Sequence, residues 1–87
     1  MIAGADGMAE GAAGMERGAR GMEQEADRLR SPAYRAEQIA KAARRGEHVT
    51  DRELVELIPK LREGARDLRR GAVEMRRQAE RMREDRH

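Results

Sequence analysis

The chain has 87 residues, of which 41% are charged and 38% hydrophobic, and Tyr34 is the one aromatic residue. This length allows one domain, residues 1–87, and the few large apolar side chains cannot fill a thick core alone. The net charge of +2 is too small to indicate a nucleic-acid partner by itself, and the lack of cysteine excludes disulfides, thiolate metal sites and cysteine nucleophiles.

Residues 1–30 carry three series with a seven-residue repeat. With Met1 at heptad position a, this position holds Met1, Met8, Met15 and Met22. Glycine fills position d (Gly4, Gly11, Gly18) and position g (Gly7, Gly14, Gly21), and alanine fills position e (Ala5, Ala12, Ala19, Ala26). At 100° per residue, g, d, a and e form one helix face about 160° wide. Glycine costs about 1 kcal/mol relative to alanine in a helix, so glycines kept in register indicate close approach of another helix.

The middle segment, residues 32–45, is expected to form a short helix or a kinked continuation of the first one. Ser31 is suited to cap a helix, and Pro32 is suited to its first position. One face of this segment is apolar: Ala36, Ile39, Ala40 and Ala43. Gly46 follows two arginines and is a typical residue at the end of a helix.

A last helix is expected over residues 51–84. Thr50 and Glu53 form a capping box, and Val49 with Leu54 forms a hydrophobic staple. Pro59 should bend this helix. The heptad pattern returns, with large residues at a (Leu54, Leu61, Leu68, Met75, Met82), glycine at d (Gly64, Gly71) and alanine at e (Ala65, Ala72, Ala79).

The short turn at residues 46–49 predicts an antiparallel hairpin in which residue i faces roughly residue 95 − i, so that Met15 lies beside Ala79 or Glu80. Six acids and two bases give residues 1–27 a net charge of −4, and nine arginines and six acids give residues 61–87 a net charge of +3. Opposite charges suit neighbouring arms. The predicted fold is all-α: an antiparallel helical hairpin with Gly/Ala heptad packing.

Two helices make a single layer and leave apolar surface exposed, so we expect the hairpin to dimerise into a four-helix bundle. The second glycine series, at g, is the natural place for another hairpin to dock. The predicted oligomer interface consists of Gly4, Gly7, Gly11, Gly14, Gly18, Gly21, Met8, Met15 and Met22.

An arginine strip is the first alternative site. It runs along position b of the last helix (Arg62, Arg69, Arg76, Arg83), with Arg70 and Arg77 beside it. Such a strip could bind nucleic acid or another polyanion, although acidic residues interrupt it and no aromatic side chain there can stack on a base. Glu16 and Glu23 could instead pair with Arg69, Arg76 or Arg83 across the hairpin.

The methionines are the second alternative, because thioether sulfur suits copper(I). Sulfurs seven residues apart on one helix are about 10 Å apart, so a site would need sulfurs from another helix. His48 and His87 could add imidazole ligands but lie in the expected turn and at the last residue. The simpler interpretation is that methionine fills space opposite glycine, and no cofactor is predicted.

The pattern as a whole favours a non-catalytic, self-associating helical module that binds a macromolecular, most simply protein, partner. No P-loop, nucleophile elbow, zinc signature or Glu-x-x-His pair occurs, so an enzyme is not expected. Tyr34 is expected to pack near the hairpin tip and is the best single anchor for a partner. With no membrane-spanning segment or signal peptide in the sequence, a cytoplasmic location is the default expectation, and a processed exported form stays open.

The expected layout, a small antiparallel hairpin that dimerises, resembles the Rop-type RNA-binding bundle and the secreted WXG-type hairpins. The resemblance is one of architecture. The chain has no tryptophan, so the WXG signature is missing and no site residue follows from the resemblance.

Overall fold

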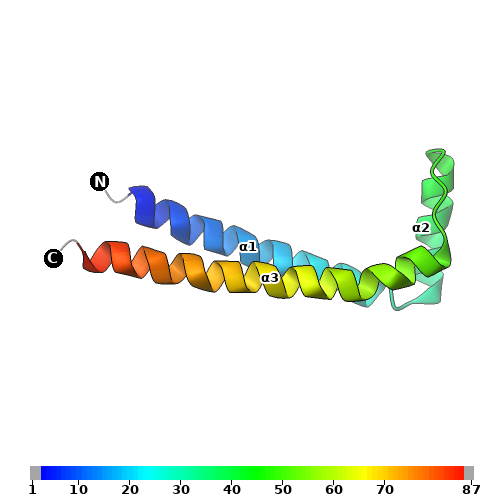
Figure 1. Cartoon of the computed structure of the whole chain (residues 1–87). Helices are drawn as coiled ribbons and strands as arrows, with labels where there is room; N and C mark the ends of the chain where they lie inside the picture. The colour runs from blue at the N-terminus through cyan, green and yellow to red at the C-terminus, as the bar shows by residue number, and fades with distance from the viewer. Residues whose placement is uncertain (1–2, 86–87) are drawn as a thin grey trace.

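The structure, a computed structural model, describes residues 3–85 of the chain. These residues form three helices and no strand: α1 (Ala3–Arg28), α2 (Pro32–Arg44) and α3 (Asp51–Glu84). Helices α1 and α3 lie side by side and run in opposite directions, while α2 stands across the end of this hairpin that is remote from both termini (Figure 1). The longest dimension is 58 Å. The all-α fold and the packing of α1 against α3 are therefore as the sequence predicts.

Helix α2 is a separate helix rather than a kinked continuation of α1. Helix α1 ends at Arg28, and the Ser31 side chain accepts a hydrogen bond from the Tyr34 backbone N–H (3.3 Å) at the start of α2. At its other end, Gly46 has a φ of +80°, and the Gly46 and Glu47 N–H groups donate to the Ala43 and Ala42 carbonyls. Glycine takes this left-handed conformation without strain, so both ends of α2 are fixed by local chemistry.

Helix α3 begins where the capping signal places it. The Thr50 hydroxyl accepts a hydrogen bond from the Glu53 N–H (3.1 Å). Pro59 lies inside α3, and the helix continues through it although proline supplies no N–H to the ladder. In Figure 1 the first turns of α3 lean away from the axis of its longer part, which runs beside α1.

The buried side chains are small along the hairpin and larger at its closed end. Outside the paired arms, Leu29 just after α1, Ala42 in α2 and Leu54 in the first turn of α3 are buried. Along the hairpin itself, the side chains with 5% or less of their surface exposed are all alanines at position e: Ala5, Ala12, Ala19, Ala26, Ala65, Ala72 and Ala79.

The predicted register of the hairpin is wrong by about nine residues. Met15 lies over Gly71 and Met22 over Gly64, so that facing residues sum to 86 rather than 95. The reason is α2, which does not extend either arm but crosses the hairpin end. The connection between the paired arms therefore includes α2 and the first turns of α3, and its centre lies several residues before Gly46.

Candidate functional site

The glycines at position d lie under long side chains of the opposite helix. A Cβ atom placed on Gly11 would lie 2.6 Å from Met75 Cε, and one placed on Gly18 would lie 3.3 Å from Leu68 Cδ1. The relation is reciprocal, because a Cβ on Gly64 or Gly71 would lie 3.1 Å from the sulfur of Met22 or Met15. Each arm thus supplies glycines that leave room for position-a side chains of the other.

The second glycine series has a different environment. No described atom lies within 4 Å of where a Cβ would stand on Gly7 or Gly21, and Gly14 meets only the guanidinium of Arg17 on its own helix, at 3.7 Å. The g glycines are therefore open along α1, while the d glycines are occupied by α3. The sequence alone does not separate these two roles, because both series have the same spacing.

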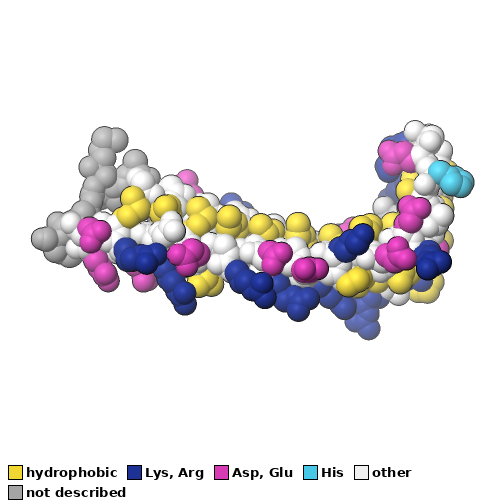
Figure 2. Space-filling model, viewed as in Figure 1, with side chains coloured by type: hydrophobic (Ala, Val, Ile, Leu, Met, Phe, Trp, Pro, Cys, Tyr) yellow, Lys and Arg dark blue, Asp and Glu magenta, His cyan; other side chains and the backbone are white. Residues whose placement is uncertain are grey.

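One face of the hairpin is an apolar strip, which we define by its position-a residues Met8, Met15, Met22, Leu61, Leu68, Met75 and Met82. Most of these side chains are half-buried, and Met82 is 41% exposed. Figure 2 shows hydrophobic side chains in a row along one edge of the hairpin, with arginine side chains mostly along the opposite edge. Leu57, 40% exposed at position d near the closed end, extends the strip.

The four arginines at position b form a row of ion pairs between the two helices. Arg69 pairs with Glu23 (2.6 Å), Arg76 with Glu16, Arg62 with Asp27 (3.8 Å) and Arg83 with Asp6 (3.8 Å). The pairs of Glu16 and Glu23 are among those that the sequence predicts. The ion pairs of Asp6 and Asp27 cannot be predicted without the register, because both residues lie at position f rather than at position b.

The pairing of Glu23 with Arg69 lowers the pKa of this carboxyl, mainly through the hydrogen bond from the guanidinium and secondarily through its charge. A depressed pKa in the folded state adds stability above the unfolded-state value, 4.5 for this group, and this contribution is lost as the pH falls below it. We expect the urea midpoint to fall between about pH 6 and about pH 3 by more in the unsubstituted chain than in Glu23→Gln. Equal falls in both proteins would contradict a role for this pair.

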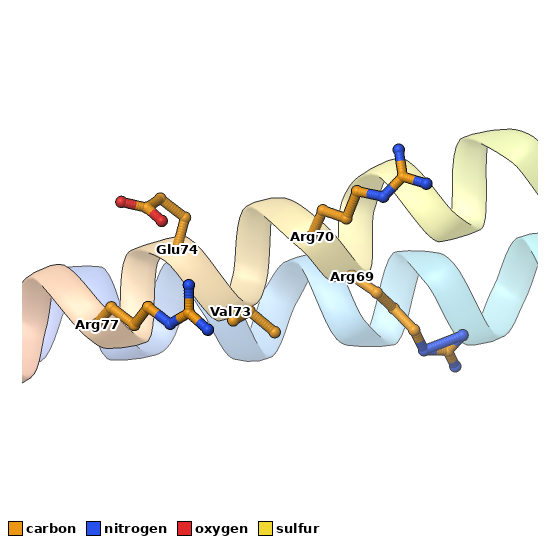
Figure 3. A pocket seen from close by; sticks show the side chains of 5 residues that line it. All are labelled: Arg69, Arg70, Val73, Glu74 and Arg77. Carbon is orange, nitrogen blue, oxygen red and sulfur yellow. The ribbon is translucent and has the colours of Figure 1, made fainter.

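The arginines around Val73 on α3 do not converge on one point. Arg69, Arg70, Val73, Glu74 and Arg77 line a shallow depression on the outer surface of the helix. Figure 3 shows their side chains splayed along α3 rather than directed at a common centre. Acidic neighbours are close, since Asp67 pairs with Arg70 (3.4 Å) and Glu74 with Arg81 (3.3 Å). The predicted polyanion strip is therefore interleaved with carboxylates over most of its length.

Tyr34 ties α2 to α1. Its hydroxyl donates to the carboxylate of Glu25 (2.5 Å to Oε1), and this hydrogen bond raises the pKa of Tyr34 above 10.0. Arg35 next to it donates to the Leu29 carbonyl and to Asp51 at the start of α3, both at 2.7 Å. The expected location of Tyr34 near the hairpin tip fits this half-buried position, while the bracing role of Arg35 carries no sequence signal.

The candidate ligands of the copper(I) alternative are methionine and histidine side chains. Within residues 3–85, no group of three or more histidine, cysteine, aspartate or glutamate side chains could hold a metal ion. His48 is exposed in the loop before α3, and His87 lies outside the described residues. The register does place Met75 between the levels of Met8 and Met15, so thioethers of both helices alternate along the apolar strip.

None of the helices, as far as they are described, is long and apolar enough to cross a membrane. No family model matches this chain. Comparisons with curated proteins and with solved structures find no match either.

Proposed function

We propose that this protein is a non-catalytic helical module that self-associates through the apolar strip and binds a macromolecular, most simply protein, partner. In this proposal Gly/Ala heptad packing holds α1 against α3, and the strip with the open glycines of α1 forms the association surface. The observation that carries it is the partial exposure of this strip. It holds the longest apolar side chains of the chain, and the hairpin covers these side chains from one side only.

The geometry supports this proposal in two ways. A two-helix layer whose core is alanine buries little apolar surface, and a second layer on the strip would add to it. The strip runs along α3 from Leu61 to Met82, a span of 22 residues, about 33 Å at 1.5 Å per residue. Two helices side by side are about 20 Å wide, at 10–12 Å each, so the face of the hairpin that carries the strip offers roughly 650 Å² per copy. This lies within the range typical of one side of a stable protein interface.

The direct test is the oligomeric state of the full chain, measured by sedimentation velocity over a range of concentrations. We expect a dimer at micromolar concentration that dissociates on dilution. A folded monomer at every concentration up to hundreds of micromolar would contradict the proposal.

The open glycines allow a sharper test, because adding a methyl group at Gly7 and Gly21 affects the hairpin and its association in opposite directions. In the isolated hairpin, Gly7→Ala and Gly21→Ala meet no described atom, so each should stabilise the helix by about 1 kcal/mol and raise the melting temperature by roughly 4–8 °C. In the dimer the same methyl groups should hinder close approach and weaken association. Melting curves on dilute protein and sedimentation on concentrated protein measure the two effects separately, and a gain in stability with unchanged association would exclude these glycines from the interface.

Binding of nucleic acid or another polyanion is the first alternative. Arg77 favours it, because it is exposed and has no carboxylate within ion-pair distance among residues 3–85. The inter-helix pairs of Arg62, Arg69, Arg76 and Arg83 count against it, since a phosphate would have to displace a carboxylate at each. Affinity for duplex RNA or DNA that falls steeply with salt would support this alternative.

Copper(I) binding by methionine is the second alternative, favoured by the alternation of thioethers from both helices along the strip. Titration with copper(I) under reducing conditions tests it. Loss of binding in Met15→Leu and Met75→Leu, which keep the apolar volume, would assign the ions to these sulfurs.

A further inference from the structure

We propose that the second copy docks in the opposite direction, with α1 antiparallel to α1 of the second copy and the two-fold axis near Gly14. This inference rests on the proposed self-association and adds its geometry. It places the two α2 helices at opposite ends of the assembly.

The open glycines are symmetric about their middle member. When two α1 helices cross antiparallel at Gly14, Gly7 of each faces Gly21 of the other, so the helices can approach closely over the whole series. Helix α3 offers no equivalent, because its g positions hold Lys60, Asp67, Glu74 and Arg81. Contact between the two α1 helices is therefore the closest approach available on this face.

The charges beside the glycines complement one another in this arrangement. Glu10 and Arg17 both occupy position c, which lies next to position g on the outer side of α1. Both residues are exposed. Neither forms an ion pair with another residue in the described part of the chain, as the pairs of α1 use Asp6, Glu16, Glu23 and Asp27. Antiparallel contact near Gly14 brings Glu10 of one copy to Arg17 of the other, and the two-fold axis repeats this pair.

The same-end alternative lacks this complementarity. There, α1 would lie beside α3 of the second copy in a register like that of the hairpin, with facing residues summing to about 86. Glu10 would approach Arg77, an attractive contact, but Arg17 would approach Arg70, a repulsive one. The two contacts oppose each other, so charge selects the opposite-end arrangement.

A charge swap on the full chain tests the arrangement. In Glu10→Arg and in Arg17→Glu, each symmetric pair becomes repulsive, and we expect the dimer dissociation constant to rise about tenfold or more. The double variant Glu10→Arg/Arg17→Glu restores unlike pairs, and its dissociation constant should return to within about threefold of the original. Arg20→Glu is the matched control, because it makes the same charge change on α1 at the exposed position f, away from the strip.

The ends of the assembly give an independent measure. The chain contains no cysteine, so Ala40→Cys on exposed α2 can carry a single spin label. Opposite-end docking about Gly14 separates the two closed ends by about 45 Å, which is twice the 15-residue rise from Gly14 to Leu29. Same-end docking should bring the labels within about 30 Å, given interaxial distances of 8–10 Å.

The outcomes separate this inference from the proposed function. A dimer with charge-swap rescue and a label distance of about 45 Å or more supports the inference. A dimer without rescue, or with labels within about 30 Å, overturns the antiparallel arrangement and leaves self-association standing. A monomer at all concentrations overturns both.

Discussion

Ala12→Leu is expected to destabilise the hairpin by about 3 kcal/mol, at the upper end of the usual cost of overpacking. Ala12 has no exposed surface, and Ala72, which lies within two residues of the position that the register sets opposite it, is equally buried. A leucine there has no cavity to enter. Helices α1 and α3 must move apart, and because they are closely packed, this movement also disturbs the neighbouring alanines and the ion pairs beside them.

The expected destabilisation is large because the buried side chains between α1 and α3 are alanines, which leave no space for a leucine. In a chain of this size, about 3 kcal/mol corresponds to a fall in melting temperature of roughly 12–24 °C, which thermal melts by circular dichroism can measure. Ala40→Leu is the matched control, since Ala40 is exposed on α2 and the same substitution should leave the melting temperature nearly unchanged. Equal melting temperatures for the two variants would contradict close Gly/Ala packing between α1 and α3.

Local signals in the sequence predict the helices and their ends well. Ser31-Pro32, Gly46 and Thr50 each act on the few residues around them, and the structure places a cap or a stop at all three. The heptad pattern likewise identifies the alanines that α1 and α3 bury, because the period of a helix fixes which side chains share a face. In α2 the expected apolar face is mostly exposed, and Ala42 is the buried residue. These features need no knowledge of the rest of the chain.

The register between the helices needs that knowledge. The direction of α2 decides how many residues separate the paired arms, and it depends on Tyr34 reaching Glu25 and on Arg35 reaching Leu29 and Asp51. No periodicity encodes such contacts between elements. The same limit applies to the glycines, since the partition into covered d positions and open g positions follows from the side on which α3 packs.

The arginine strip illustrates how register changes the interpretation of a motif. Taken along one helix, Arg62, Arg69, Arg76 and Arg83 form a basic stripe suited to a phosphate backbone. Placed against α1, each meets a carboxylate, and the stripe becomes one side of a row of ion pairs. Each exposed pair contributes at most about 1 kcal/mol. A shift by one heptad would still set Glu16 and Glu23 beside arginines, so the pairs favour antiparallel association of α1 and α3 but do not fix its register.

The strip on the opposite side of the hairpin leads to the second large effect. Met75→Glu is expected to weaken self-association by about 100-fold or more, since it places a charge in the centre of the proposed apolar interface. The hairpin itself should stay folded, because a glutamate of similar length can lie over Gly11 and direct its carboxylate to solvent. Val73→Glu is the matched control: it adds the same charge two residues away, at a side chain that is 47% exposed beside Arg69 and Arg77. Sedimentation velocity measures association, and circular dichroism verifies that both variants remain helical.

If both variants dimerise as tightly as the unsubstituted chain, the strip does not form the interface, and the partly exposed methionines need another explanation. If Met75→Glu alone yields folded monomers, the methionines over glycine serve two contacts at once, covering the opposite arm within one hairpin and meeting a second hairpin with the side that remains exposed.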